Sequence, residues 1–142
     1  MKKLILLTVL FFSLFAAGGS ETSNAQKNQR LNSTPKAFRI FYAKFRNAVV
    51  KGDKNTVASL TQFPFKYGFD AGDEGTFSKA QFIKRFVDIF GGERKIFGQK
   101  NPIFYLYSET GTFELTDSDD ASHYTFEKKG ASYKFKAYAA EP

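Results

Sequence analysis

The sequence predicts an α+β domain in which about three helices from the N-terminal half pack on a curved, mainly antiparallel sheet. Aromatic residues recur at helical spacings of three and four before residue 52, and at the alternate positions of a strand in several later segments. The 18 phenylalanines and 7 tyrosines supply a core for a chain that has no cysteine and hence no disulfide.

A signal peptide is expected at residues 1–25. Two lysines precede an apolar run from Leu4 to Ala17, and small residues up to Ala25 suit cleavage before Gln26. The run is shorter than the ~20 residues of a membrane-spanning helix, so an uncleaved anchor is the weaker alternative. We therefore expect a periplasmic or secreted protein.

The remainder of the chain has the length of one domain. Residues 26–34 are polar without apolar periodicity, and we expect them to form a flexible lead-in to a single domain at 35–142. The formal net charge of +7 favours anionic surroundings.

The first helix is expected to begin at Pro35, with Thr34 as N-cap, and to end at Gly52 in a left-handed conformation. Its core-facing row is Phe38, Phe41, Tyr42, Phe45 and Val49.

Two further helices follow from capping signals. Asp53 is placed to cap a short helix up to Leu60, and Ser78 and Gln81 form a capping-box pattern that begins a helix up to Phe90. A short helical turn that carries Ile96 and Phe97 is also expected.

Rings at Phe63, Phe65, Tyr67 and Phe69 alternate with smaller or polar residues, as in a strand with one buried face. Pro64 places the beginning of this strand at an edge or a bulge. Residues 71–76 are expected to form a loop.

The later part of the chain is expected to form four strands, at 103–108, 112–116, 122–128 and 132–139. A tight turn at Lys129-Gly130 joins the last two. This turn places Phe126 opposite Tyr133, Tyr124 opposite Phe135, and His123 opposite Lys136.

Three segments carry a resemblance to a known family: FYAKFRNAVVKGDKNTVASLTQFPFKYGF, SKAQFIKRFVDIF and the closing YKFKAYAAE. Together they resemble the small exported NTF2-like (cystatin-like fold) proteins of Gram-negative bacteria, over nearly the whole of residues 26–142. The resemblance implies a cone with a pocket between helices and sheet. It implies no single function, because that superfamily includes isomerases, dehydratases, transport factors and binding modules.

No catalytic, metal or cofactor site is expected. The carboxylates fall at caps, in loops or on predicted wet faces, and His123, the only histidine, shares a polar face with Thr125. The acidic turn 117–120 lacks the glycine and glutamate of a calcium-binding EF-hand loop, so we expect it to be solvated.

Two kinds of partner are expected. The first helix has basic residues and no acidic ones, which suits either a solvated face or contact with an anionic envelope component through Lys36, Arg39, Lys44, Arg46 and Lys51. Export argues against nucleic acid. The second expected partner is a small apolar or aromatic ligand. The candidate residues for lining its pocket are Tyr67, Tyr105, Phe113 and Tyr124. The alternative is that these rings belong to a filled core.

These expectations favour a non-catalytic exported binding or accessory domain. The alternatives are a protein-interaction module that forms a homodimer through the open face of the sheet, and an enzyme of the lyase or isomerase type. The enzyme would need an acid or a histidine deep in the pocket.

Overall fold

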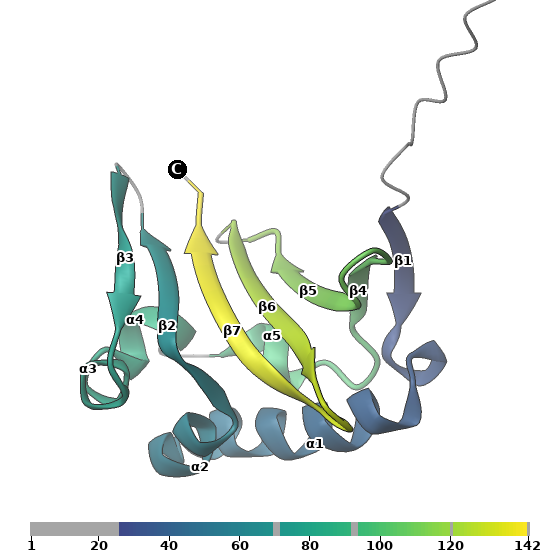
Figure 1. The fold of residues 1–142 in the computed structure, drawn as a ribbon, viewed down its shortest axis with the longest axis horizontal. Helices are drawn as coiled ribbons and strands as arrows, with labels where there is room; N and C mark the ends of the chain where they lie inside the picture. The colour runs from purple at the N-terminus through teal and green to yellow at the C-terminus, as the bar shows by residue number, and fades with distance from the viewer. Residues whose placement is uncertain (1–25, 70–71, 92–93, 120, 142) are drawn as a thin grey trace, which may run out of the picture.

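A computed structural model describes residues 26–69, 72–91, 94–119 and 121–141 (Figure 1). The helical elements are η1 Leu31–Ser33, α1 Lys36–Lys51, α2 Lys54–Ser59, α3 Lys79–Lys84, α4 Phe86–Phe90 and α5 Lys95–Gly98. The strands are β1 Gln26–Arg30, β2 Thr61–Phe69, β3 Asp73–Phe77, β4 Ile103–Tyr107, β5 Thr112–Asp117, β6 Ser122–Lys129 and β7 Ser132–Ala140. The expected signal peptide lies outside the described residues.

The described strands form one sheet in the order β1-β4-β5-β6-β7-β2-β3. Neighbours are antiparallel except for β2 and β7, which are parallel. Figure 1 shows α1 running across one face of the curved sheet, with α2 following it. This arrangement confirms the expected α+β class.

The first helix has the expected row of buried residues. Its five predicted core residues are buried, together with Ala48. Gly52 ends the helix at φ 70° and ψ 22°, as expected, and its N–H donates to Ala48 and Val49. The N-cap is Pro35 instead of Thr34, because the buried Thr34 hydroxyl donates back to the carbonyl of Leu31 at 2.7 Å.

The two predicted caps are confirmed. Asp53 accepts a hydrogen bond from the N–H of Thr56 at the start of α2, and Ser78 and Gln81 form the reciprocal capping box of α3. The expected third helix is broken at Arg85 into α3 and α4. The backbone of Arg85 has φ −92° and ψ 13°, and its guanidinium lies over the rings of Phe69 and Phe77.

The ring-bearing strand β2 is confirmed, with its odd positions toward the helices. Its pairing with β7 is irregular between Thr61 and Lys66, so the bulge expected at Pro64 is present. The loop expected at 71–76 is wrong over its described part, because β3 pairs with β2. The ring of Tyr67 stacks on Phe77 at 4.0 Å and covers Gly75, so ring contacts hold a strand whose other residues are polar.

The flexible lead-in expected at 26–34 is also wrong for these residues. Residues 26–30 form β1, which pairs with β4 at the edge of the sheet, and η1 continues the chain toward α1. An edge strand needs no apolar alternation, because backbone hydrogen bonds hold it and solvent covers its outer side. Leu31 packs against the core and fixes the end of the segment.

The hairpin of β6 and β7 confirms both strands but corrects their register. Its turn is Gly130-Ala131, with Gly130 at φ 57°, and Phe126 lies opposite Phe135. Lys136 is then an extra residue, so that Thr125 lies opposite Ala137 and His123 opposite Ala139 instead of Lys136. The bulge lets Tyr138 as well as Phe135 face the core.

Candidate functional site

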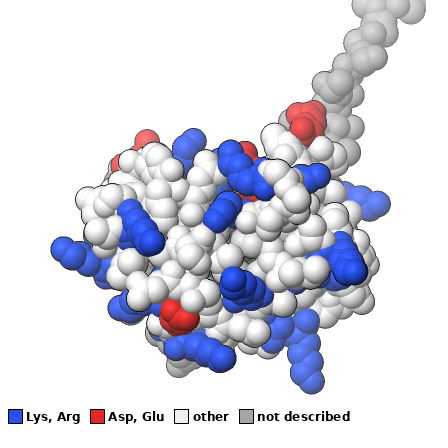
Figure 2. All heavy atoms as spheres, turned by 60° about the horizontal axis from the view of Figure 1, so that its bottom comes forward, with Lys and Arg blue, Asp and Glu red and all other residues white. Residues whose placement is uncertain are grey.

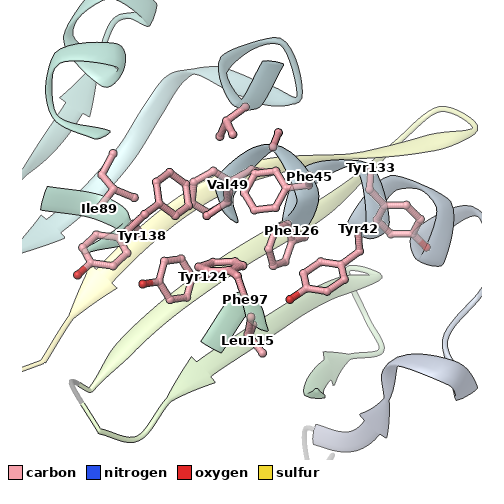
Figure 3. Packing of buried hydrophobic residues seen from close by; sticks show 14 of the residues in the cluster. Tyr42, Phe45, Val49, Ile89, Phe97, Leu115, Tyr124, Phe126, Tyr133 and Tyr138 are labelled. Atoms are coloured by element: carbon pink, nitrogen blue, oxygen red, sulfur yellow. The ribbon is translucent and has the colours of Figure 1, made fainter. Parts of the chain in front are cut away.

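The interior between helices and sheet is packed with rings over the described residues (Figure 3). Phe45, on α1, has its ring centroid 5.2 Å from that of Phe126 and 5.1 Å from that of Phe135. Such edge-to-face and tilted contacts fill the space that an open cone would leave to a ligand.

The four rings expected to line a pocket do not meet in one place. Phe113 stacks on Phe38 at 4.2 Å, Tyr124 lies edge-on to Phe97 at 5.0 Å, and Tyr67 stacks on Phe77. Tyr105 follows the buried Phe104 on β4 and so lies on the opposite face of the sheet. Their role in ligand binding stays a prediction.

A hollow of about 270 Å³ opens elsewhere, at the end of the sheet beside α5. We call it the α5 groove. Its lining residues are Ile96, Gln99, Ile103, Leu115, Thr116, Asp117, Ser118 and Asp119. The buried side chains of Ile96 and Phe97 anchor α5 to the core, and β5 extends past the end of β4, which leaves this space between them.

The α5 groove has an apolar floor and a polar rim. Ile96 and Leu115 are almost completely buried, while Asp117 and Asp119 are joined by a hydrogen bond from the N–H of Asp119 to Oδ1 of Asp117 at 3.1 Å. The carboxylates at this rim can accept hydrogen bonds from a ligand. Sequence reasoning missed the groove because its lining comes from three segments, none of which has a ligand-binding pattern.

One buried polar group in the core has no partner among the described residues. The hydroxyl of Tyr42 makes no hydrogen bond although the residue is completely buried, and burial raises the pKa of Tyr42 well above its ordinary value. In Figure 3 this hydroxyl points along the sheet toward Phe97 and Leu115. Leu115 lines the α5 groove, and the ring of Phe104, its partner on β4, lies 4.9 Å from that of Tyr42.

The single histidine takes part in a polar cluster on the open face of the sheet. Nδ1 of His123 lies 3.1 Å from Oε1 of Glu114, and its Nε2 lies 3.5 Å from Oε1 of Glu141. Thr116 lies within 3.4 Å of both His123 and Glu114, and Tyr107 donates to Glu114 at 3.4 Å. Thr116 therefore connects this cluster to the rim of the α5 groove.

No carboxylate or histidine is buried among the rings in the described residues. The buried polar residues there are Thr34, Thr61, Thr112 and Ser122. No group of three or more potential metal ligands was found in the same ranges, and no helix in them is long and apolar enough to cross a membrane. The α5 groove combines a hollow with carboxylates at its rim.

The basic residues expected to act together on α1 have different surroundings. Arg39 is half-buried and donates to the carbonyls of Asn32 and Thr34, while Arg46 is half-buried and acts electrostatically on Tyr42. The three lysines of this set are exposed: Lys36, Lys44 and Lys51.

No protein-family model matches the chain, and no curated protein does. Several solved structures are similar to it. One is an NTF2-like protein of unknown function from Shewanella oneidensis, 8% identical over 72% of this chain and 94% of that chain, with a TM-score of 0.39. Another, from Nostoc punctiforme, has a cystatin-like fold and unknown function, with 10% identity over 72% and 85% of the chains and a TM-score of 0.38.

A third is an NTF2-like protein with a cystatin-like fold from Novosphingobium aromaticivorans, 12% identical over 72% of this chain and 77% of that chain, with a TM-score of 0.37. Two of these structures are described as NTF2-like and two as having a cystatin-like fold. They say nothing about function. The narrower resemblance, to exported proteins of Gram-negative bacteria, stays a prediction.

Proposed function

We propose that this protein is a non-catalytic binding domain that takes a small molecule in the α5 groove. The observation that carries the proposal is the combination of an apolar floor with an acidic rim in one hollow of about 270 Å³. Small-molecule pockets usually have volumes of roughly 300–1,000 Å³, so the ligand is small.

The lining defines the chemical class of this ligand. Ile96, Ile103 and Leu115 suit an aromatic or aliphatic body, and the carboxylates of Asp117 and Asp119 suit a hydrogen-bond donor such as an amine or a hydroxyl. Because the lining offers more polar than apolar surface, the expected ligand is a small molecule with hydrogen-bond donors and a short aromatic or aliphatic part.

The test is native mass spectrometry of the purified protein, to detect a small molecule that copurifies with it. Ile103, which is 45% exposed, is replaced in Ile103→Trp to fill the groove from its rim without disturbing the core. Val87→Trp is the control, because Val87 is exposed to a similar degree, 53%, and does not line the groove.

We expect the wild type and Val87→Trp to carry the additional mass, and Ile103→Trp to lose it. Retention of the mass by Ile103→Trp would place the ligand elsewhere. Absence of any copurifying mass, together with unchanged amide spectra on titration with benzylamine and benzyl alcohol, would contradict the proposal.

A second candidate function is that of a homodimer formed through the open face of the sheet. Ile103, Tyr105 and Tyr107 follow one another on this face of β4, and Tyr107 is 37% exposed. Rings at such positions are typical of protein interfaces. Sedimentation equilibrium at high protein concentration tests this, and a monomer would exclude it.

Export is part of the proposed function. It is supported by the two lysines and the apolar run from Leu4 to Ala17. Amino-terminal sequencing of protein recovered from the periplasm or the medium is expected to begin at Gln26. Protein that keeps residues 1–25 and stays with the membrane fraction would favour the uncleaved anchor.

A further inference from the structure

The solvent side of α1 carries two large aliphatic side chains among cations, in addition to the apolar face that it buries in the core. Ile40 is 63% exposed and Val50 is 50% exposed, and the exposed Ala43 and Asn47 lie between them on the same side of the helix. The exposed Lys36, Lys44 and Lys51 lie beside these residues. We call these seven residues the outer α1 face.

The outer α1 face lies in a segment without negative charge. The sequence has no aspartate or glutamate between Gln26 and Gly52. Among the described residues, none of the three lysines of this face forms an ion pair. Figure 2, which turns the side of α1 toward the viewer, shows lysine and arginine side chains spread over this surface and acidic ones sparse.

Exposed aliphatic side chains distinguish this face from an ordinary solvated basic surface. Soluble proteins expose single apolar residues without consequence, but here two large ones lie on one helix among cations. An acidic polysaccharide offers nothing to cover them. The boundary between headgroups and acyl chains of a bilayer offers phosphates to lysines and a nonpolar layer to aliphatic side chains.

We propose that the outer α1 face docks on an anionic lipid surface. The lysines contact lipid phosphates, and Ile40 and Val50 enter the headgroup layer. The helix need not leave the domain for this, because Phe38, Phe45 and Val49 on its other side are completely buried in the core. The domain therefore lies on the membrane as a rigid body, with its sheet directed away from the lipid.

The experiment is flotation with two kinds of vesicle, one of equal parts phosphatidylglycerol and phosphatidylcholine and one of phosphatidylcholine alone. We expect binding to the anionic vesicles only, and a steep decrease in half-molar salt because exposed charges are screened. A lysine near an anionic surface contributes roughly a fivefold increase in binding. Lys44→Glu with Lys51→Glu is therefore expected to weaken binding by at least about 25-fold.

Matched controls separate this face from net charge and from general exposure. Lys27→Glu with Lys66→Glu makes the same charge change on β1 and β2, and is expected to have a much smaller effect. Ile40→Ser is expected to weaken binding several-fold, while Val87→Ser, an exposed valine on α4, leaves it unchanged. Every variant is compared in the processed form that begins at Gln26, so that the apolar run from Leu4 to Ala17 does not itself bind the vesicles.

Three outcomes would overturn the proposal. One is failure of the wild type to float with anionic vesicles, and another is equal weakening by the control charge reversal. The third is binding that needs the lysines but is unaffected by Ile40→Ser and Val50→Ser together, which would indicate an acidic polymer or protein in place of lipid. Circular dichroism of each variant checks that the exposed substitutions leave the fold intact.

Discussion

Replacing Tyr42 by phenylalanine is expected to stabilise the protein, which is an unusual direction for a change in a core. The hydroxyl is buried without a partner in the described residues, and the ring stays in contact with Phe38, Phe104 and Phe126 after the change. Leaving a buried polar group unpaired costs about 1–3 kcal/mol. Tyr42→Phe should recover part of this cost.

The expected gain in the free energy of unfolding is about 1–2 kcal/mol, because the ring volume is unchanged and no cavity forms. For a domain of this size, each kcal/mol raises Tm by roughly 4 °C. Urea denaturation followed by circular dichroism measures the free energy, and an unchanged m-value would show that the unfolded state is not affected.

Tyr138→Phe is the matched comparison, because it makes the same chemical change at another buried tyrosine. The hydroxyls of Tyr138 and Ser122 lie 3.1 Å apart in a buried hydrogen bond, so its loss is expected to destabilise the protein by about 1 kcal/mol. The two variants should therefore move stability in opposite directions. If Tyr42→Phe is instead as destabilising as Tyr138→Phe, the Tyr42 hydroxyl has a partner and the reasoning fails.

Three other changes test the same structure. Burial raises the pKa of Tyr42 above its ordinary value of 10.0, so above pH 10 the folded state keeps a proton that the unfolded chain releases. The contribution of Tyr42 to stability is therefore complete below pH 10 and decreases above it, by about 1.4 kcal/mol per pH unit at most. Tyr42→Phe should reduce this dependence of stability on pH, as measured by urea denaturation at high pH. Ser78→Ala removes the N-cap of α3 and should cost about 1 kcal/mol by the same assay, whereas Lys79→Ala, next to it and exposed, should cost little. Gly52→Ala forces a side chain into a backbone with φ 70°, and a loss of stability of about 1–2 kcal/mol is expected; no loss would mean that the corner between α1 and α2 can change its conformation.

The parts of the fold that depend on burying apolar groups could be predicted from the sequence. The period of rings in α1 and the alternation of rings in β2 each identify one buried face, and the caps at Asp53 and Ser78 follow from local hydrogen-bonding chemistry. Edge strands have no such requirement. Both β1 and β3 consist mainly of polar residues held by backbone pairing, so a search for apolar patterns missed them.

The hairpin register could not be obtained from the turn alone. A two-residue turn fits both Lys129-Gly130 and Gly130-Ala131, and only the bulge at Lys136 keeps rings opposite rings under the second choice. The sequence does contain a signal for this bulge. Phe135 and Tyr138 are three residues apart, so a regularly alternating strand cannot direct both side chains to the same face. The α5 groove has no comparable signal in the sequence, because it forms where β5 extends beyond the end of β4.

The central position of β7 constrains how the chain can fold during synthesis. This strand joins β6, its neighbour in sequence, to β2, which is made about seventy residues earlier. A nascent chain on the ribosome therefore holds two partial sheets with unpaired edges until β7 emerges, and such edges are sites of aggregation. Completion of the domain late in translation would keep the polypeptide accessible to chaperones for most of its synthesis.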